Sequence, residues 1–254
     1  MNTANPRHIA IVGATSSIAE HCARRWLALG GVQRLTLIGR APERLQALAA
    51  DLRIRGGDTE VRCLSGDMLT APDVQSLVTQ ACQPDAPDLV LIAHGSLPEQ
   101  AACQNDLALT ADALLVNGVS PALFAEAFVA HLIAAGQPAT LGLIGSVAGD
   151  RGRKTNYVYG AAKGLVERYA QGLQHRLATT AVRVCLIKPG PTATPMTAHL
   201  QSQGAKLAPV DEVAADIVRG LTAGKAVIYT PAKWWLIMNV IRHLPRWIFH
   251  KLNI

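Results

Sequence analysis

Short apolar runs alternate along the chain with longer segments in which apolar residues recur at helical spacing. Most of the runs are continuously apolar, which is typical of strands buried on both faces of a parallel sheet. They predict seven strands, at residues 8–12, 34–38, 60–64, 88–93, 140–145, 182–187 and 226–230. Helices are expected at 18–29, 42–55, 71–82, 107–134, 157–178 and 211–223.

This alternation predicts a single α/β domain, a doubly wound parallel sheet of about seven strands with helices on both faces. Residues 1–230 contain no repeat, low-complexity stretch or linker, so they are expected to form that one domain. Residues 231–254 are expected to be a C-terminal amphipathic extension and not an independent domain. Ligands of such sheets bind in the crevice at the carboxyl ends of the strands, where functional residues are therefore expected.

Composition agrees with a globular cytoplasmic protein. Half of the 254 residues are hydrophobic and 17% are charged, which excludes a disordered chain. The five cysteines are odd in number and form no CxxC pair, so neither a disulfide framework nor a metal site is expected. The N-terminus lacks the pattern of a signal peptide. The apolar run Trp234–Met238 is far shorter than the roughly 20 residues of a membrane span.

The net positive charge of the chain comes from its C-terminal end. Six of the 24 basic residues follow the last acidic residue, Asp216, so the remaining 18 balance the 18 acidic residues. Three of the four tryptophans also lie in residues 231–254. A helix with this composition suits a bilayer interface, and the alternatives are packing on the core, covering the substrate cleft or a dimer contact. Without a recognised motif, the basic excess does not indicate nucleic-acid binding.

Tyr159 and Lys163 carry the clearest chemical signal, because residues four apart lie on one face of a helix. A lysine cation at that distance is expected to lower the phenol pKa from about 10 toward neutrality. Tyr159 can then exchange a proton with a carbonyl oxygen as hydride is transferred. Ser146, at the end of the fifth predicted strand, is expected to hold that oxygen. Asn117 is expected to position a water that relays protons to Lys163.

A glycine turn follows the first predicted strand and leads into a helix, in the sequence Gly13-Ala14-Thr15-Ser16-Ser17. Free N–H groups at a helix N-terminus bind phosphate, which predicts a dinucleotide site there, although a plain helix cap has a similar pattern. The second strand ends at Gly39-Arg40, where an NAD site usually has an acid. Arg40 can pair with a 2′-phosphate, which favours NADP(H) over NAD(H); the alternative is a solvated arginine. Asp67 follows the third strand, where it can bond adenine or cap a turn.

These motifs together resemble the short-chain dehydrogenase/reductase family over nearly the whole chain. The family has a Rossmann-type fold and an Asn-Ser-Tyr-Lys tetrad, which matches Asn117, Ser146, Tyr159 and Lys163. The resemblance implies an NAD(P)-dependent oxidoreductase of ketones and secondary alcohols, which often assembles as a homo-oligomer through its two long helices. It implies cofactor contacts at Gly13, Thr15, Ser16, Ser17, Ile18, Arg40, Asp67, Met68, Ala93, His94, Gly95, Tyr159, Lys163, Pro189, Gly190, Thr192 and Thr194.

The chain departs from the family pattern at two places. Ser17 and Ala19 stand where the family has glycines, and Ile92-Ala93-His94-Gly95 replaces its Asn-Asn-Ala-Gly. These departures affect the details of cofactor contacts. His94 is interpreted as a packing or hydrogen-bonding residue, and extra chemistry is the alternative. Arg153 and Lys154 are assigned to a solvated loop.

Several stretches, including GATSSIA and the tail VIYTPAKWWLIMNVIRHLPRWIFHKLNI, resemble one branch of the family. These are the reductases that act with a flavin oxidase as decaprenylphosphoryl-ribose 2′-epimerase. The resemblance implies reduction of a 2-keto sugar on a polyprenyl phosphate, on the inner face of a membrane. Two alternatives remain: a soluble reductase of a small ketone, keto sugar or acyl compound, and a nucleotide-sensing protein without turnover.

Overall fold

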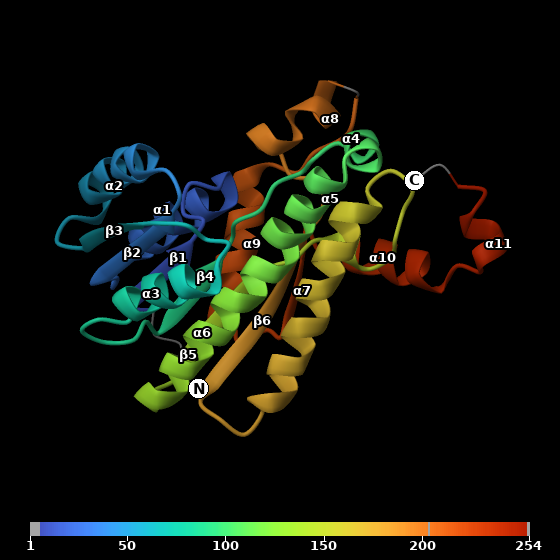
Figure 1. Cartoon of the computed structure of the whole chain (residues 1–254). Helices are drawn as coiled ribbons and strands as arrows, with labels where there is room; N and C mark the ends of the chain where they lie inside the picture. The colour runs from blue at the N-terminus through green and yellow to red at the C-terminus, as the bar shows by residue number, and fades with distance from the viewer. Residues whose placement is uncertain (1–5, 203, 253–254) are drawn as a thin grey trace.

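The computed structural model describes residues 6–202 and 204–252, and a seven-stranded sheet forms the centre of the fold (Figure 1). The strand order is β3-β2-β1-β4-β5-β6-β7, and every pairing is parallel. The strands are β1 (His8–Val12), β2 (Arg34–Gly39), β3 (Glu60–Ser65), β4 (Leu89–Ile92), β5 (Ala139–Ile144), β6 (Val182–Pro189) and β7 (Val227–Thr230). The predicted fold class is confirmed.

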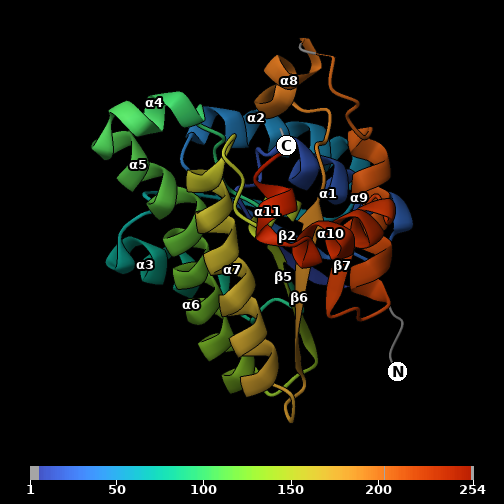
Figure 2. The same ribbon diagram turned by 90° about the vertical axis from the view of Figure 1, so that its right-hand side faces the viewer.

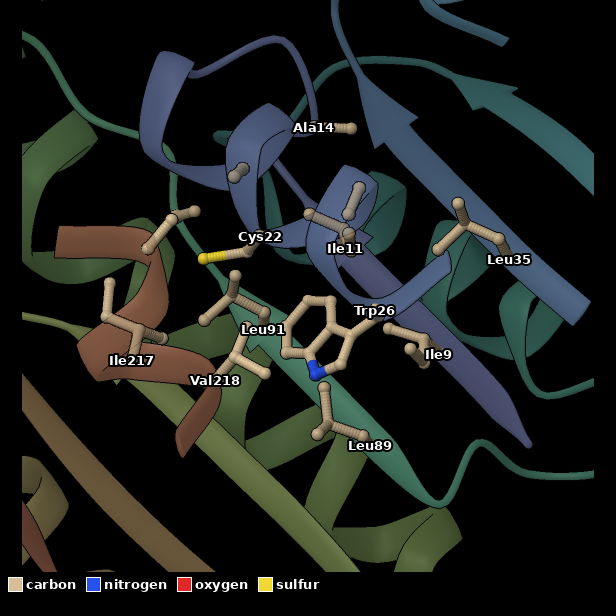
Figure 3. Packing of buried hydrophobic residues seen from close by; sticks show 14 of the residues in the cluster. Ile9, Ile11, Ala14, Cys22, Trp26, Leu35, Leu89, Leu91, Ile217 and Val218 are labelled. Atoms are coloured by element: carbon tan, nitrogen blue, oxygen red, sulfur yellow. The ribbon is translucent and has the colours of Figure 1, made fainter. Parts of the chain in front are cut away.

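Helices cover both faces of the sheet (Figures 1 and 2). They are α1 (Ser17–Leu29), α2 (Pro42–Gly56), α3 (Ala71–Ala81), α4 (Gln100–Asn105), α5 (Leu107–Leu114), α6 (Ser120–Ala135), α7 (Tyr157–Arg176), α8 (Ala198–Ser202), α9 (Val210–Thr222), α10 (Lys233–His243) and α11 (Arg246–Phe249). On one face, α1, α2 and α9 pack around Trp26, whose indole is 1% exposed (Figure 3). On the other, α3, α6 and α7 enclose a second apolar cluster around Phe124 and Phe128.

The strand order reverses between β1 and β4, and this switch point opens a crevice at the carboxyl ends of the strands. The turn after β1 passes very close to the loop after β4. Gly13 has a φ of +74°, and a Cβ at that position would lie 2.6 Å from Cβ of His94. Only glycine combines this left-handed backbone with so close an approach.

The predicted helix at 107–134 is interrupted in the structure. A π-helical turn, Leu115–Val119, joins α5 to α6 and contains Asn117. Pattern analysis could not find it, because the apolar spacing continues through the turn. The stretch Leu107–Ala135 is long and apolar enough to cross a membrane by composition alone, but 61% of its apolar 18-residue window is buried, and α6 packs on the sheet and α7. Short helices such as α4 and α8 were not predicted.

The C-terminal extension folds into α10 and α11, which lie beyond β7 at the edge of the sheet (Figure 2). Met238 is fully buried, and the indole of Trp234 packs directly on Gly190, since a Cβ there would lie 1.9 Å from Nε1. The Arg151 guanidinium donates to the carbonyl of Leu244 at 2.7 Å and lies 3.8 Å from the ring centre of Phe249. The extension is therefore attached to the loop that follows β5.

A buried ammonium group joins four elements beneath the crevice. Nζ of Lys188, in β6, donates to the carboxylate of Asp150 and, at 2.9 Å, to Glu167 of α7. The hydroxyl of Tyr229, in β7, donates to Asp150 at 3.2 Å. Burial alone lowers the pKa of Lys188, but its hydrogen bonds to the carboxylates of Asp150 and Glu167 outweigh this and raise that pKa above its usual value.

Replacement of this lysine tests how much the network stabilises the fold. In Lys188→Met, Asp150 and Glu167 remain buried without a cation, and we expect a loss of about 3–5 kcal/mol in the free energy of unfolding. Urea denaturation measures it. The loss is expected to be smaller at pH 5 than at pH 8, because unpaired buried carboxylates have raised pKa values and become neutral as the pH falls.

Arg219→Met is the matched control, because the pair between Arg219 and Asp216 is exposed. We expect this change to cost no more than about 1 kcal/mol. An equal loss in the two variants would contradict the assigned importance of the buried network.

Candidate active site

Two connected cavities occupy the carboxyl ends of the strands. The inner cavity, of about 150 Å³, lies over β5 and β6 beside the start of α7. The outer groove, of about 320 Å³, runs from the glycine turn after β1 to the end of β2. Residues common to both linings make the two spaces continuous: Ser16, Ile18, His94, Gly95, Thr194 and Met196.

The inner cavity brings together all four residues of the predicted tetrad, which come from three separate elements. Tyr159 and Lys163 lie one turn apart in α7, and Lys163 Nζ is 5.8 Å from the centre of the phenol ring. Nζ donates to the carbonyl of Ile144 at 3.0 Å, which fixes the ammonium at the end of β5. Ser146 follows β5 directly, and its hydroxyl is hydrogen-bonded to Tyr159. The geometry needed for proton transfer to a carbonyl is present.

The pKa of Tyr159 was expected to be lowered, but in the structure it is raised. Burial raises the pKa of the phenol above its usual value, and the hydrogen bond from Ser146 only partly opposes this. Burial also lowers the pKa of Lys163 to about 8. The expected depression of the Tyr159 pKa is thus wrong here, because burial disfavours the charged phenolate. A phenol that keeps its proton at neutral pH is the form that donates to a carbonyl oxygen during reduction.

Asn117 holds the loop after β4 in place. Its Oδ1 accepts from the backbone N–H of Ser96 at 2.8 Å, and its Nδ2 donates to the carbonyl of Ala113 at 2.9 Å. A Cβ at Gly95 would lie 2.7 Å from this Oδ1 and 3.6 Å from Lys163 Nζ. The side-chain amide therefore acts as a clamp beside Lys163. The predicted water relay stays a prediction.

The outer groove has the features that an extended dinucleotide requires. At one end, the turn at Gly13 leaves no room for a side chain, and the N-terminus of α1 opens beside it at Ser16 and Ser17. At the other end, the exposed guanidinium groups of Arg40 and Arg44 line the groove. These residues fit a dinucleotide, with phosphates at the helix N-terminus and an anionic group near the arginines.

Most of the predicted cofactor residues line one of these two spaces. In the groove are Gly13, Thr15, Ser16, Ser17, Ile18, Arg40, Met68, His94, Gly95 and Thr194, and the inner cavity adds Ala93, Tyr159, Lys163, Pro189, Gly190 and Thr192. Asp67 is the exception. Its exposed carboxylate accepts from the backbone N–H of Leu69 at 2.9 Å, so it caps a turn and does not line the groove.

His94 is a neutral hydrogen-bonding residue between the two spaces. Burial lowers the pKa of His94 to about 3, with further repulsion from Lys163 and Arg40. Its Nε2 lies 2.8 Å from Oγ of Ser120, and that hydroxyl donates in turn to the carbonyl of Met68 at 2.5 Å. His94 therefore links the loops that follow β3 and β4, in line with its interpretation as a hydrogen-bonding residue.

Arg153 is the residue of this site that sequence reasoning missed. It was assigned with Lys154 to a solvated loop, and Lys154 is indeed exposed. Arg153 is half-buried and lines the inner cavity with Tyr159. The sequence signal that could have placed Arg153 in the site is its position six residues before Tyr159, in the segment that enters α7. A basic residue in a loop usually faces solvent, so composition alone could not reveal it.

Relatives match this chain over most of its length. The profile for the short chain dehydrogenases matches residues 7–205. An uncharacterized oxidoreductase of Streptomyces coelicolor is 31% identical over 252 residues, covering 98% of this chain and 97% of the relative. Another of Mycobacterium tuberculosis is 32% identical over 248 residues, which is 96% of each chain. A sulfoacetaldehyde reductase of Chromohalobacter salexigens is 30% identical over 216 residues, covering 84% and 81%.

Solved structures share the fold. A short-chain dehydrogenase from Sphingobium yanoikuyae in complex with NADPH has a TM-score of 0.79 at 24% identity, covering 94% of this chain and 96% of that one. Levodione reductase has a TM-score of 0.78 at 21% identity, covering 88% and 95%. The matched length and the identity to relatives place the chain in the short-chain dehydrogenase/reductase family, as an NAD(P)-dependent oxidoreductase that acts on carbonyl or alcohol groups.

Proposed function

We propose that this chain is an NADPH-dependent reductase of a 2-keto sugar carried on a polyprenyl phosphate, and that it works at a membrane surface with a flavin oxidase as the source of the keto sugar. The observation that carries the proposal is the C-terminal extension. It presents exposed tryptophans and cations, and it is attached to the loop that leads from Ser146 to Tyr159.

The protonated phenol of Tyr159 in the inner cavity supports reduction of a carbonyl as the direction of the reaction. A bound nicotinamide cofactor supplies the hydride. Tyr159 then donates its proton from Oη to the carbonyl oxygen, and Ser146 stabilises the negative charge that develops there. Lys163, fixed by the carbonyl of Ile144, keeps a positive charge beside the phenol as the proton leaves.

Arg40 and Arg44 support NADP(H) over NAD(H). Both guanidinium groups are exposed at the end of the groove that starts at the helix N-terminus, and no acidic residue lines the described groove. A guanidinium binds a phosphate with two parallel hydrogen bonds, whereas the ribose hydroxyls of NAD(H) favour a carboxylate.

The surface of the extension supports contact with an anionic membrane. Trp235, Leu236, Val240 and Trp247 are 58%, 62%, 56% and 67% exposed. The surrounding cations Lys233, Arg242, Arg246 and Lys251 are exposed, and residues 233–252 contain no acid. Indole rings and cations together suit the headgroup region of an anionic leaflet.

A second candidate is a soluble reductase of a small charged carbonyl compound. The 30% identity to sulfoacetaldehyde reductase favours it. The two candidates share the tetrad, so they differ only in what the substrate carries beyond its carbonyl group.

Substitution of the proposed proton donor tests the reductase itself. In Tyr159→Phe, we expect the rate of NADPH-dependent reduction of a farnesylphosphoryl 2-ketopentose and of sulfoacetaldehyde to fall at least about 100-fold, because general acid catalysis is lost. The dissociation constant of NADPH, measured by fluorescence, should change less than about twofold. Tyr169→Phe is the control, since Tyr169 lies in the same helix and lines neither the inner cavity nor the outer groove. Equal rates in both variants would refute the assigned role.

Cofactor preference is tested at the end of the groove. For Arg40→Asp, we expect kcat/KM for NADPH to fall about 10- to 100-fold, the value of a charge-assisted hydrogen bond, while kcat/KM for NADH rises. Arg55→Ala, another exposed arginine, should leave both values unchanged. An unaltered ratio of NADPH to NADH in Arg40→Asp would remove the basis for the proposed preference.

Membrane contact is tested with the double variant Trp235→Ser/Trp247→Ser. It keeps the buried Met238 and the Trp234 contact, and we expect its binding to vesicles containing phosphatidylglycerol to weaken at least about tenfold. Deletion of residues 232–254 should weaken binding further, and added salt should weaken binding of the intact chain. Ile54→Ser, at an 87% exposed position on α2, is the control. Equal sedimentation of the truncated and intact chains with vesicles would exclude the membrane role.

A further inference from the structure

The guanidinium of Arg153 lacks a partner in the part of the chain that the structure describes. Its Nε is fully buried and has no hydrogen bond, and no ion pair to a carboxylate is formed within the described residues. Burial lowers the pKa of Arg153, with opposition from Asp150, yet an arginine stays charged at neutral pH. A partly buried cation without a hydrogen-bonded partner is costly, so a ligand that supplies an anion would recover this free energy.

A second unpartnered polar atom lies in the same lining. Oδ1 of Asn156 is buried without a hydrogen bond, and Asn156 lines the inner cavity with Arg153 and Tyr159. Asn156 immediately precedes α7 and is three residues from Arg153, whose carbonyl accepts from its backbone N–H at 3.1 Å. The two side chains are thus held together by the backbone turn that enters the catalytic helix.

The charge of the inner cavity is one-sided. Arg153 and Lys163 are cations, and none of the described residues that line the cavity is acidic. Arg153 is absent from the lining of the outer groove, where Arg40 and Arg44 lie. The unpaired guanidinium therefore serves the substrate end of the site and not the phosphates of the dinucleotide.

We infer that Arg153, assisted by Asn156, binds a tetrahedral oxyanion of the substrate, a phosphate or sulfonate a few bonds from the carbonyl carbon that is reduced. This inference rests on the proposed reductase function and narrows its substrate to anionic carbonyl compounds. The guanidinium binds two oxygens of the anion in parallel, and the Asn156 carbonyl oxygen accepts from a hydroxyl group next to it. Arg153 is a specificity-determining residue in this scheme, and Tyr159 remains the proton donor.

Arg153 also borders a second depression, which opens toward the C-terminal extension. Tyr157, Phe249 and Leu252 supply its apolar surface, and Lys154 and His250 also line it. An anion at Arg153 would therefore lie where the inner cavity meets an apolar path. A prenyl chain attached to the phosphate fits this path, whereas a small phosphate or sulfonate needs only the arginine.

Paired substrates test the inference directly. Dihydroxyacetone phosphate has a phosphate on the carbon next to its ketone, and dihydroxyacetone is its neutral counterpart. In Arg153→Gln, we expect kcat/KM for the phosphate ester to fall about 10- to 100-fold, mainly through KM, with little change for dihydroxyacetone. Arg153→Lys should be intermediate, because it keeps the charge but loses the paired hydrogen bonds.

Lys225→Gln is the control, because it removes a positive charge from an exposed position that lines neither the inner cavity nor the second depression. It should leave both substrates unaffected. The KM for NADPH should not change in any of these variants. If Arg153→Gln and Lys225→Gln have the same effect, or if Arg153→Gln impairs both substrates equally, the anion-binding role is overturned.

Binding measurements separate this inference from the proposed function. Calorimetric titration of dihydroxyacetone phosphate into the enzyme–NADP⁺ complex requires no turnover. Binding that depends on Arg153 without reduction of any carbonyl would support the oxyanion site and refute the proposed reductase. Reduction of neutral and anionic ketones with equal kcat/KM in the intact chain and in Arg153→Gln would refute the oxyanion site alone.

Inhibitors distinguish the two sources of the anion. Inhibition by farnesyl phosphate and by inorganic phosphate should both depend on Arg153. A lipid-linked phosphate would be identified if farnesyl phosphate bound at least about tenfold more tightly than inorganic phosphate, and if this difference were smaller in Leu252→Ser. Equal affinities would identify a small soluble anion. The inference would be overturned if inhibition by each of the two compounds were the same in Arg153→Gln as in the intact chain.

Discussion

The buried ammonium of Lys188 determines how the catalytic segment is placed on the sheet. Its bonds to Asp150 and Glu167, and the bond from Tyr229 to Asp150, join β6, β7, the β5–α7 loop and the middle of α7. Charges removed from water in this way are stable only when each one has partners. The loop and the helix therefore cannot shift independently, and Tyr159 and Ser146 remain within hydrogen-bond reach.

The same loop then serves three different surfaces. Asp150 points into the core, Arg151 binds the end of α10, and Arg153 faces the inner cavity. Neighbouring side chains of an extended or turning segment point in different directions, so a few residues can contact the core, the extension and the substrate space. The position of the C-terminal extension relative to Tyr159 is consequently set by the segment that also carries the catalytic serine.

The sheet was predictable because each strand is a continuous apolar run bounded by polar residues, and strands buried on both faces require such runs. The tetrad was predictable for a similar local reason, since four-residue spacing puts Tyr159 and Lys163 on one face of a helix. Three features were not predictable from local residue spacing. The π-helical turn at Asn117 continues the apolar spacing of its neighbours, Asp67 was equally compatible with two roles, and Arg153 resembled an ordinary loop cation.

Burial explains both the protonated phenol and the importance of the unpaired arginine. Electrostatic interactions are stronger in a desolvated cavity, so desolvation keeps the proton on Tyr159 and holds the pKa of Lys163 at about 8. A lysine with that pKa is only partly protected from losing its charge at mildly alkaline pH. The hydrogen bond from Lys163 to the carbonyl of Ile144 is the contact that holds the ammonium beside the phenol. The same desolvation makes the unpaired guanidinium of Arg153 a strong site for an anion, because attraction between opposite charges increases when water is removed.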